Sequence, residues 1–188
     1  MKLIVGLGNP GPDYESSRHN AGYWIIDSVS ERIGLELTKK KFKAVYASGK
    51  YEGIPLVMLK PLTYMNLSGL SVSAAMSFFN IDFEDLLVIH DDVDLPPGRI
   101  RMKKGGGSAG HKGVESIVDQ LGADDFYRLR FGVGRPENLN MDTSDFVLER
   151  VSSEEKEAFG QWSKEAADAA LYFLKEGLLA AQNRFHAK

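Results

Sequence analysis

The chain has 188 residues, of which 43% are hydrophobic and 26% charged, and its formal net charge is −3 at pH 7; these values are typical of a globular protein and favour one domain over residues 1–188. Cysteine is absent, which excludes a disulfide framework, a thiolate nucleophile and a cysteine-ligated metal. The N-terminal apolar run is too short for a signal peptide and no run approaches the ~20 residues of a transmembrane helix, so we expect a soluble cytoplasmic protein that makes no use of a membrane.

Predicted strands and helices alternate along the chain. Apolar or alternating stretches predict strands at 2–7, 43–51, 54–60, 86–90, 98–103 and 127–134. Helical spacing predicts helices at 20–33, 68–80 and 111–121, and glycine and proline predict loops at 9–18 and 105–110. This alternation indicates an α/β domain with a mostly parallel sheet, and a hairpin near Gly53 makes the sheet mixed.

The C-terminal stretch predicts a long helix. Ser152 and Glu155 match a capping box, in which each residue satisfies a backbone N–H of the other. Apolar residues then follow one helical face until Gly177 interrupts it, and a short helix continues to about His186.

Basic residues gather in two places despite the negative net charge. Between Pro96 and Val114 there are five basic residues and no acid: Arg99, Arg101, Lys103, Lys104 and Lys112. Glycines adjoin these charges, so we expect this stretch to bind phosphate. A second cluster comprises Lys39, Lys40, Lys41 and Lys43, and for it we favour a solvated surface.

The motif GLGNPG at 6–11 matches the glycine spacing of a dinucleotide-binding loop. That site needs a helix to begin within the motif, with its N-terminus facing the pyrophosphate. Pro10 and Pro12 flank Gly11 and oppose helix formation there. We therefore favour a glycine turn that presents the amide of Asn9 at the carboxyl end of the first strand, where α/β proteins usually place sites.

The motif RHNAG places His19 at the start of the first predicted helix. The positive end of the helix dipole disfavours a protonated imidazole, and a neutral imidazole is what a general base must be. A histidine that only caps the helix is the alternative.

The segment LLVIHDDVD ends an apolar strand with several acidic residues. A carboxylate such as that of Asp91 could accept the N–H of His19 and orient the ring. Asp91, Asp92 and Asp94 could instead form an all-oxygen Mg²⁺ site, or be acids in a surface turn.

Two further motifs carry side chains suited to ester chemistry. GGGSAG surrounds Ser108 with the spacing of a nucleophile elbow, but the stretch before it is basic rather than a core strand. A glycine loop that holds phosphate through its backbone is the stronger interpretation. In PLTYMNLSG, Asn66 precedes a helix and could cap it or donate to an oxyanion.

Six motifs occur in a fixed order along the chain: GLGNPG, RHNAG, MNLSG, HDDVDLPPG, GGGSAGHKG and LRFGVGRP. Together they closely resemble bacterial-type peptidyl-tRNA hydrolase, and the resemblance spans nearly the whole chain. It implies a monomer with a twisted mixed sheet and a C-terminal helix beside the cleft. It also implies hydrolysis of the ester between peptide and tRNA in peptidyl-tRNA during translation, with no metal, cofactor or obligate protein partner.

The resemblance assigns the reacting groups. His19 is implied as the base that acts on water, and Asp91 as the group that holds its imidazole. Asn9 and Asn66 are implied to position the substrate and to stabilise the developing oxyanion.

The resemblance also assigns substrate contacts. Met65 and Tyr14 are implied to line the cleft near the tRNA end. Lys103 and Arg130 match positions that clamp the tRNA 5′ phosphate. Family members often carry asparagine where this chain has Lys112, so we expect Lys112 to meet the substrate through a phosphate instead of an amide contact.

Replacing Ser108 with alanine separates a base-catalysed hydrolase from a serine hydrolase. We expect ester hydrolysis by the Ser108→Ala variant to stay close to that of the parent, because His19 activates water directly. Steady-state hydrolysis of a peptidyl-tRNA checks this, and abolished activity would favour the serine mechanism. The sequence also leaves open a Mg²⁺ nuclease, which EDTA would stop, and a catalytically silent RNA-binding relative.

Overall fold

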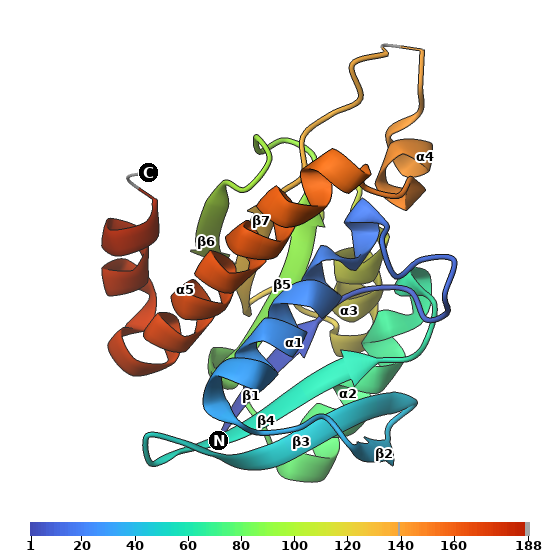
Figure 1. Ribbon diagram of the computed structural model, residues 1–188. Helices are drawn as coiled ribbons and strands as arrows, with labels where there is room; N and C mark the ends of the chain where they lie inside the picture. The colour runs from blue at the N-terminus through green and yellow to red at the C-terminus, as the bar shows by residue number, and fades with distance from the viewer. Residues whose placement is uncertain (139, 187–188) are drawn as a thin grey trace.

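The computed structural model describes residues 1–138 and 140–186, and a seven-stranded mixed sheet runs through its centre (Figure 1). The strand order is β2-β3-β4-β1-β5-β7-β6. The strands are β1 (Lys2–Gly6), β2 (Lys39–Lys41), β3 (Ala44–Tyr51), β4 (Ile54–Pro61), β5 (Leu86–Asp92), β6 (Ile100–Lys104) and β7 (Tyr127–Gly132). The four central strands β4, β1, β5 and β7 are parallel, while β2, β3 and β6 pair antiparallel with their neighbours.

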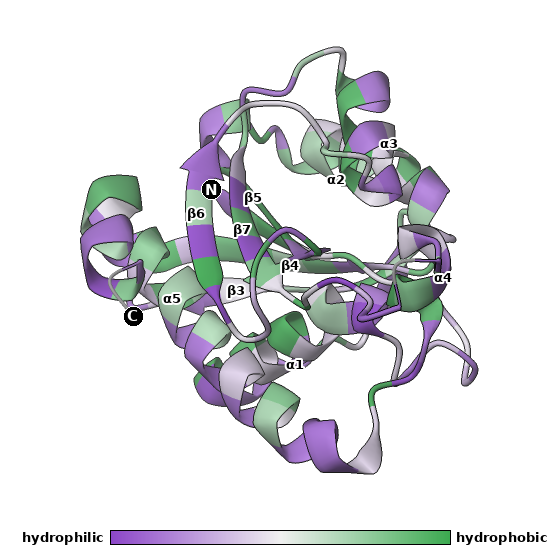
Figure 2. Ribbon diagram, turned by 90° about the horizontal axis from the view of Figure 1, so that it is seen from above, coloured by the Kyte–Doolittle hydropathy of each residue, from purple (hydrophilic) through white to green (hydrophobic). Residues whose placement is uncertain are grey.

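Helices cover both faces of the sheet. The α-helices are α1 (Ala21–Ile33), α2 (Ser68–Phe79), α3 (Lys112–Leu121), α4 (Thr143–Leu148) and α5 (Ser153–Phe185), and the 3₁₀ turns are η1 (Arg18–Asn20), η2 (Met65–Leu67) and η3 (Phe83–Asp85). Seen from above, the sheet lies between α2 and α3 on one side and α1 and α5 on the other (Figure 2). None of the described helices has an apolar stretch long enough to cross a bilayer.

Residues 3–6 of β1 and 86–89 of β5 are apolar because both faces of these strands are buried. In β1, Ile4 packs with the α1 and α5 side, while Leu3 and Val5 pack with the α2 and α3 side, and all three are fully buried. Successive side chains of a strand point to opposite faces, so a sheet covered on both sides needs continuous apolar strands. Polar residues then gather where these strands end.

Close backbone packing brings the start of α1 against the sheet. A Cβ added to Gly22 would lie 2.4 Å from the Leu7 nitrogen and 2.5 Å from the Ile89 carbonyl oxygen. Only a residue without a side chain fits there. The segment that carries His19 is thereby held next to the carboxyl ends of β1 and β5.

The structure confirms most of the predicted elements, including the hairpin at Gly53, the Ser152–Glu155 capping box and the interruption at Gly177. Two elements were not predicted, the edge strand β2 and the helix α4. The prediction that Asn66 could cap a helix is wrong. Asn66 lies inside η2, the N-cap of α2 is Leu67, and the side chain that bonds this helix end is that of Ser116, whose Oγ accepts the Gly69 N–H at 3.0 Å.

The C-terminal part of α5 covers the outer edge of the sheet. Gly177 leaves the helical conformation (φ 79°, ψ 179°), and the turns after it lie beside β6 (Figure 1). Gln182 Nε2 donates to the Met102 carbonyl at 2.9 Å, and the Met102 N–H donates to His186 Nε2 at 2.7 Å. These two side chains satisfy edge backbone groups that would otherwise be free to pair with another chain. Because Nε2 accepts, His186 is neutral here, and burial together with Arg101 lowers its pKa.

We expect the His186→Ala variant to lose protection of the Met102 amide, with hydrogen exchange about fivefold faster, since one hydrogen bond contributes about 1 kcal/mol. Asn183→Ala is the matched control, because Asn183 is exposed on the same helical turn.

The same bond is expected to weaken in acid in the parent protein. The folded-state pKa of His186 lies below its unfolded value, so its contribution is fully present above pH ~6.5 and is lost as the pH falls below that value. Amide exchange measured by NMR at two pH values, corrected for intrinsic rates, checks both statements. Equal protection of Met102 in variant and parent would contradict them.

Candidate active site

The predicted site residues converge on one cleft of about 670 Å³ at the carboxyl ends of β1 and β5. Seven of the nine predicted residues line it: Asn9, Tyr14, His19, Met65, Asn66, Asp91 and Lys112. These residues come from five separate stretches of sequence, so the fold brings together side chains that the sequence keeps apart.

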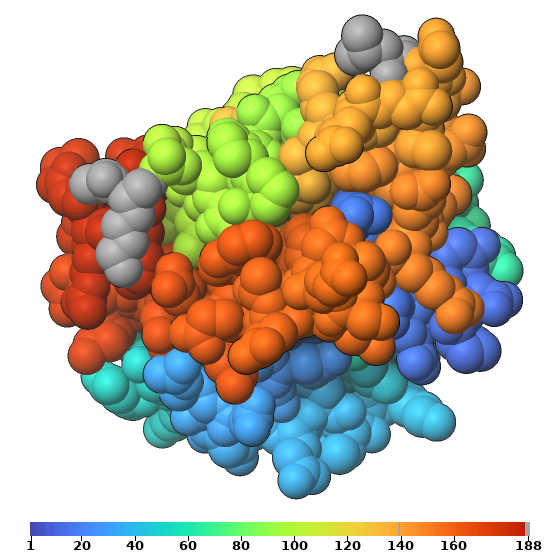
Figure 3. All heavy atoms as spheres, turned by 45° about the horizontal axis from the view of Figure 1, so that its top comes forward, coloured from blue at the N-terminus to red at the C-terminus, as the bar shows by residue number. Residues whose placement is uncertain are grey.

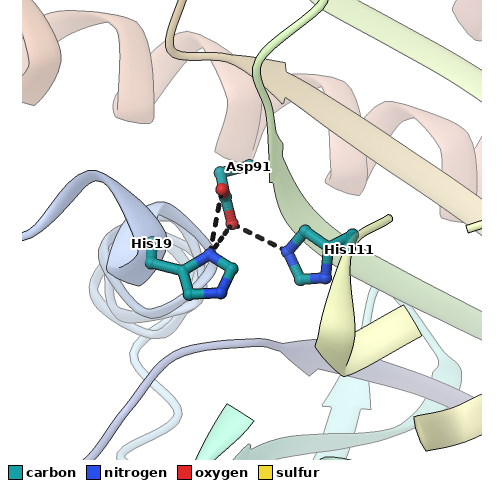
Figure 4. Close-up of side chains that lie close together, drawn as sticks. All are labelled: His19, Asp91 and His111. Carbon is teal, nitrogen blue, oxygen red and sulfur yellow. Dashed lines mark hydrogen bonds and ion pairs between the residues drawn. The ribbon is translucent and has the colours of Figure 1, made fainter. Parts of the chain in front are cut away.

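His19 and Asp91 form a hydrogen-bonded pair at the base of this cleft (Figure 4). Nδ1 of His19 lies 2.9 Å from Oδ1 and 3.0 Å from Oδ2 of Asp91. An ionised carboxylate only accepts, so Nδ1 carries the proton and Nε2 keeps its lone pair. Within the described residues Nε2 makes no hydrogen bond. The pair therefore presents an imidazole in the tautomer that a general base requires.

A second imidazole, that of His111, bonds the same carboxylate. Its Nε2 lies 2.8 Å from Asp91 Oδ1 (Figure 4). Its Nδ1 accepts the backbone N–H groups of Gly113 at 3.1 Å and Val114 at 3.3 Å, which makes His111 the N-cap of α3. Since Nδ1 accepts, the proton is on Nε2, and His111 donates to Asp91 as a neutral ring. Sequence reasoning did not connect His111 with Asp91, because its partner lies 20 residues away on another element.

Burial and mutual bonding set the pKa values of this group. Burial opposes the charged form of His19, but the charge and hydrogen bond of Asp91 outweigh it and raise the pKa of His19. Burial would raise the pKa of Asp91, but His19 and His111 hold it well below its usual range. The sequence predicted that the helix end would disfavour protonation of His19. The net shift is in the other direction, because Asp91 raises the pKa of the ring.

Among the described residues, one cluster of side chains has the spacing of metal ligands. It comprises His19, Asp91 and His111, whose ligand atoms lie within 4.8 Å of one another. The hydrogen bonds do not fit a bound metal. Both ring nitrogens that face Asp91 carry protons, and His111 cannot change tautomer without directing an N–H at those of Gly113 and Val114. The acidic trio considered for Mg²⁺ does not form such a cluster, since Asp92 bonds Arg130 and Asp94 bonds Arg135.

Asn9 is held so that its amide nitrogen is left for the cleft. Its Oδ1 accepts the Met65 N–H at 2.7 Å, and its backbone exchanges two hydrogen bonds with the Asn20 side chain. These bonds orient the amide, and Nδ2 has no hydrogen-bond partner within residues 1–138 and 140–186. An oriented N–H donor on a buried residue therefore lies in the same cleft as His19.

The remaining cleft residues differ in how firmly they are held. Met65 is buried, whereas Asn66 is exposed. The ring of Tyr14 packs edge-on against that of Tyr64 with centroids 6.5 Å apart. Lys112 is exposed and pairs with Glu115 at 2.9 Å, one turn along α3. This exposed ion pair lies at the cleft, which Lys112 lines.

The sequence and the fold were compared with those of known proteins, and both match one family. A sequence model described as peptidyl-tRNA hydrolase matches residues 3–188. The chain belongs to this family. It is 44% identical over 187 residues to the peptidyl-tRNA hydrolase of Bacillus cereus (strain ATCC 10987 / NRS 248), covering all of both chains, and 43% identical over 188 residues to that of Geotalea daltonii, covering 97% of the relative. A crystal structure of peptidyl-tRNA hydrolase from Acinetobacter baumannii matches all of this chain and 95% of that one, with a TM-score of 0.91 and 37% identity.

Lys103 and Arg130, the predicted phosphate residues of the family resemblance, lie outside the cleft on β6 and β7. Arg130 donates from Nε to Asp92 at 2.6 Å. Lys103 makes no ion pair within the described residues, and burial together with Arg128 and Arg130 lowers its pKa. Both cations are on the side of the sheet that carries α2 and α3.

Ser108 lies at the cleft but lacks a base. Its Oγ accepts the Gly110 N–H at 3.3 Å and bonds no imidazole among the described residues. The loop that carries it joins the antiparallel edge strand β6 to α3. This is not the core strand and sharp turn that a nucleophile elbow uses.

The helix α4 forms the cleft wall that the sequence did not predict. Thr143, Ser144, Val147 and Leu148 line the cleft from α4. Its segment is tied to the His19 segment through Arg18, whose guanidinium bonds Glu155 at 3.0 Å and lies over the Phe146 ring. Figure 3 shows this orange segment standing against the blue N-terminal segment. The C-terminal helix α5 reaches the site region through its first turn, at Glu155.

We expect the imidazole of His19 to titrate with a pKa above its ordinary value in the parent protein, and with a lower pKa in the Asp91→Asn variant. Removing the carboxylate leaves burial as the dominant effect, and burial favours the neutral ring. NMR titration of the histidine side chains measures both. Asp94→Asn is the control, since Asp94 pairs with Arg135 at the rim, and it should leave His19 unchanged. An equal His19 pKa in parent and Asp91→Asn would contradict the assigned coupling.

Proposed function

We propose that this protein hydrolyses the ester bond between peptide and tRNA in peptidyl-tRNA, and so returns tRNA to translation in the cytoplasm. We further propose that it acts as a monomer, with residues 1–188 as one functional unit. The observation that carries the proposal is the His19 imidazole, fixed through Nδ1 by Asp91 with Nε2 left free in the cleft. Family membership supports the substrate class.

The proposed reaction begins with water held against Nε2 of His19. Nε2 takes a proton as the water oxygen bonds the ester carbonyl carbon, and the carbonyl electron pair moves to its oxygen. The tetrahedral intermediate then collapses, and the bond to the ribose oxygen breaks. That oxygen leaves with the proton from His19, which yields free peptide and free tRNA. Asp91 stabilises the imidazolium between the two steps without being protonated itself.

The two asparagines are proposed as donors to the substrate. Asn9 is a buried residue, and the bond from the Met65 N–H to its Oδ1 orients the amide so that Nδ2 is available to the cleft. Such a preorganised donor stabilises an oxyanion by about 2.7–4 kcal/mol. Asn66 is on the exposed turn η2 at the same cleft and is suited to the peptide amide. A site that leaves polar groups unpaired with the wrong substrate selects peptidyl over aminoacyl esters.

Contacts to the tRNA are proposed on two sides of the cleft. Tyr14 and Met65 supply apolar surface near the acceptor end. Lys112 is proposed to meet a phosphate of that end in exchange for its pairing with Glu115, and its position at the cleft supports this role. Lys103 and Arg130, on the paired strands β6 and β7, are proposed to hold the 5′ phosphate.

We expect purified protein to release N-acetyl-amino acid from N-acetyl-aminoacyl-tRNA in the presence of EDTA, and His19→Ala to reduce the rate by roughly 10²–10⁴-fold, the usual contribution of a general base. The mutant loses the group that accepts the proton of water. Counting released acid per unit time checks both statements.

His186→Ala serves as the matched control, because it removes a histidine that bonds β6 away from the cleft. Parent-like turnover by His19→Ala would defeat the mechanism. Binding of tRNA without any hydrolysis by the parent would favour a non-catalytic RNA-binding protein.

A further inference from the structure

Arg128 is a buried cation whose bonds go to backbone rather than to a carboxylate. It lies on β7 with 1% of its surface exposed, and it makes no ion pair within the described residues. Its guanidinium donates to the carbonyls of Gly105, Gly106 and Gly107, the last at 2.9 Å. Burying a charge is costly, and here three carbonyls and the nearby charge of Asp124 offset that cost in place of a direct ion pair.

Arg128 also belongs to a face of like charges. In the β6–β7 pairing Lys103 lies opposite Arg128, and Arg101 lies opposite Arg130. All four side chains share one face, because each strand contributes alternate residues. Directly opposed like charges destabilise a strand pair. Asp92 is the carboxylate that bonds this face in the described structure, through Arg130, so the β6–β7 strand pair retains an excess of positive charge.

The glycine loop depends on few anchors. Gly105 and Gly106 have φ of +66° and +89°, which side chains disfavour, and glycines bring no side chain that packing could fix. Its side-chain anchors are Arg128, which holds three carbonyls, and Asp124, which accepts the Gly106 N–H at 3.0 Å, and one backbone bond joins the Gly105 N–H to the Phe126 carbonyl at 3.0 Å. In a trans peptide the C=O of one residue and the N–H of the next point in opposite directions. Carbonyls turned toward Arg128 therefore turn the following N–H groups away from it.

The loop links the cationic face to the active site. A Cβ on Gly106 would lie 3.0 Å from Lys103 Nζ, so the loop passes directly beside that ammonium group. Further along, the His111 N–H donates to the Ser108 carbonyl at 3.0 Å, and His111 bonds Asp91. The loop therefore contacts Lys103 at one end and His111 at the other, so its conformation affects the position of both residues.

We propose that Arg128 is a positioning residue for tRNA binding: its guanidinium fixes the Gly105–Gly107 carbonyls and so sets the loop against Lys103 for the incoming phosphate. The inference rests on the proposed function, since it takes the 5′ phosphate as the anion bound beside Lys103 and Arg130. A lysine keeps the charge but places three donors on one atom, and it cannot reproduce the planar fork that reaches three carbonyls. Arg128→Lys therefore separates positioning from charge.

The experiment compares Arg128→Lys with Arg101→Lys, which changes a guanidinium on the same face that bonds the His186 carbonyl and not the loop. Each protein is assayed with peptidyl-tRNA that carries or lacks the 5′ phosphate. We expect Arg128→Lys to raise KM for the phosphorylated substrate about tenfold or more and to abolish its advantage over the dephosphorylated one, with kcat little changed. Hydrogen exchange at 105–110 should be faster in this variant only.

A merely structural role for Arg128 would lower the folded fraction, which reduces apparent kcat and leaves KM as in the parent. Parent-like KM, or parent-like exchange in the loop, would overturn the proposal. If the parent does not distinguish the two substrates, the 5′-phosphate assignment fails, and KM together with loop exchange still decides the role of Arg128.

Discussion

The site depends on one buried carboxylate that accepts from two imidazoles. Asp91 is 2% exposed, and a carboxylate removed from water to this extent is tolerated only when charged or polar hydrogens surround it. The N–H groups of His19 and His111 provide them, and each bond fixes the tautomer of its ring. A single side chain at the end of β5 thereby ties together the segment before α1 and the first turn of α3.

The fold delivers these groups through ordinary packing rules. Parallel strands buried on both faces end at one edge, so polar residues that follow β1 and β5 become neighbours. Gly22 allows α1 to approach that edge closely enough for the preceding turn to reach Asp91. The geometry of the His19–Asp91 pair is thus a consequence of close backbone packing as much as of side-chain choice.

Much of this arrangement could be predicted from the sequence, and the exceptions have physical reasons. His19 and Asp91 follow strong local signals, a helix start and a strand end. The strand β2 was missed because Lys39–Lys41 lack β propensity, and pairing with β3 imposes the conformation. The prediction of a cap at Asn66 failed because the 3₁₀ turn before α2 has no sequence signature. The role of His111 depends on a partner on another strand, which local patterns do not encode.

The two edges of the sheet are closed by different means, lysines on β2 and the side chains of Gln182 and His186 on β6. Covering β6 with side chains from the end of α5 affects the order in which the sheet is completed during synthesis. Residues 178–186 leave the ribosome after every strand has been translated, so β6 stays uncovered while the rest of the sheet is already able to assemble. Protection against wrong partners at this edge begins only when these turns emerge and dock.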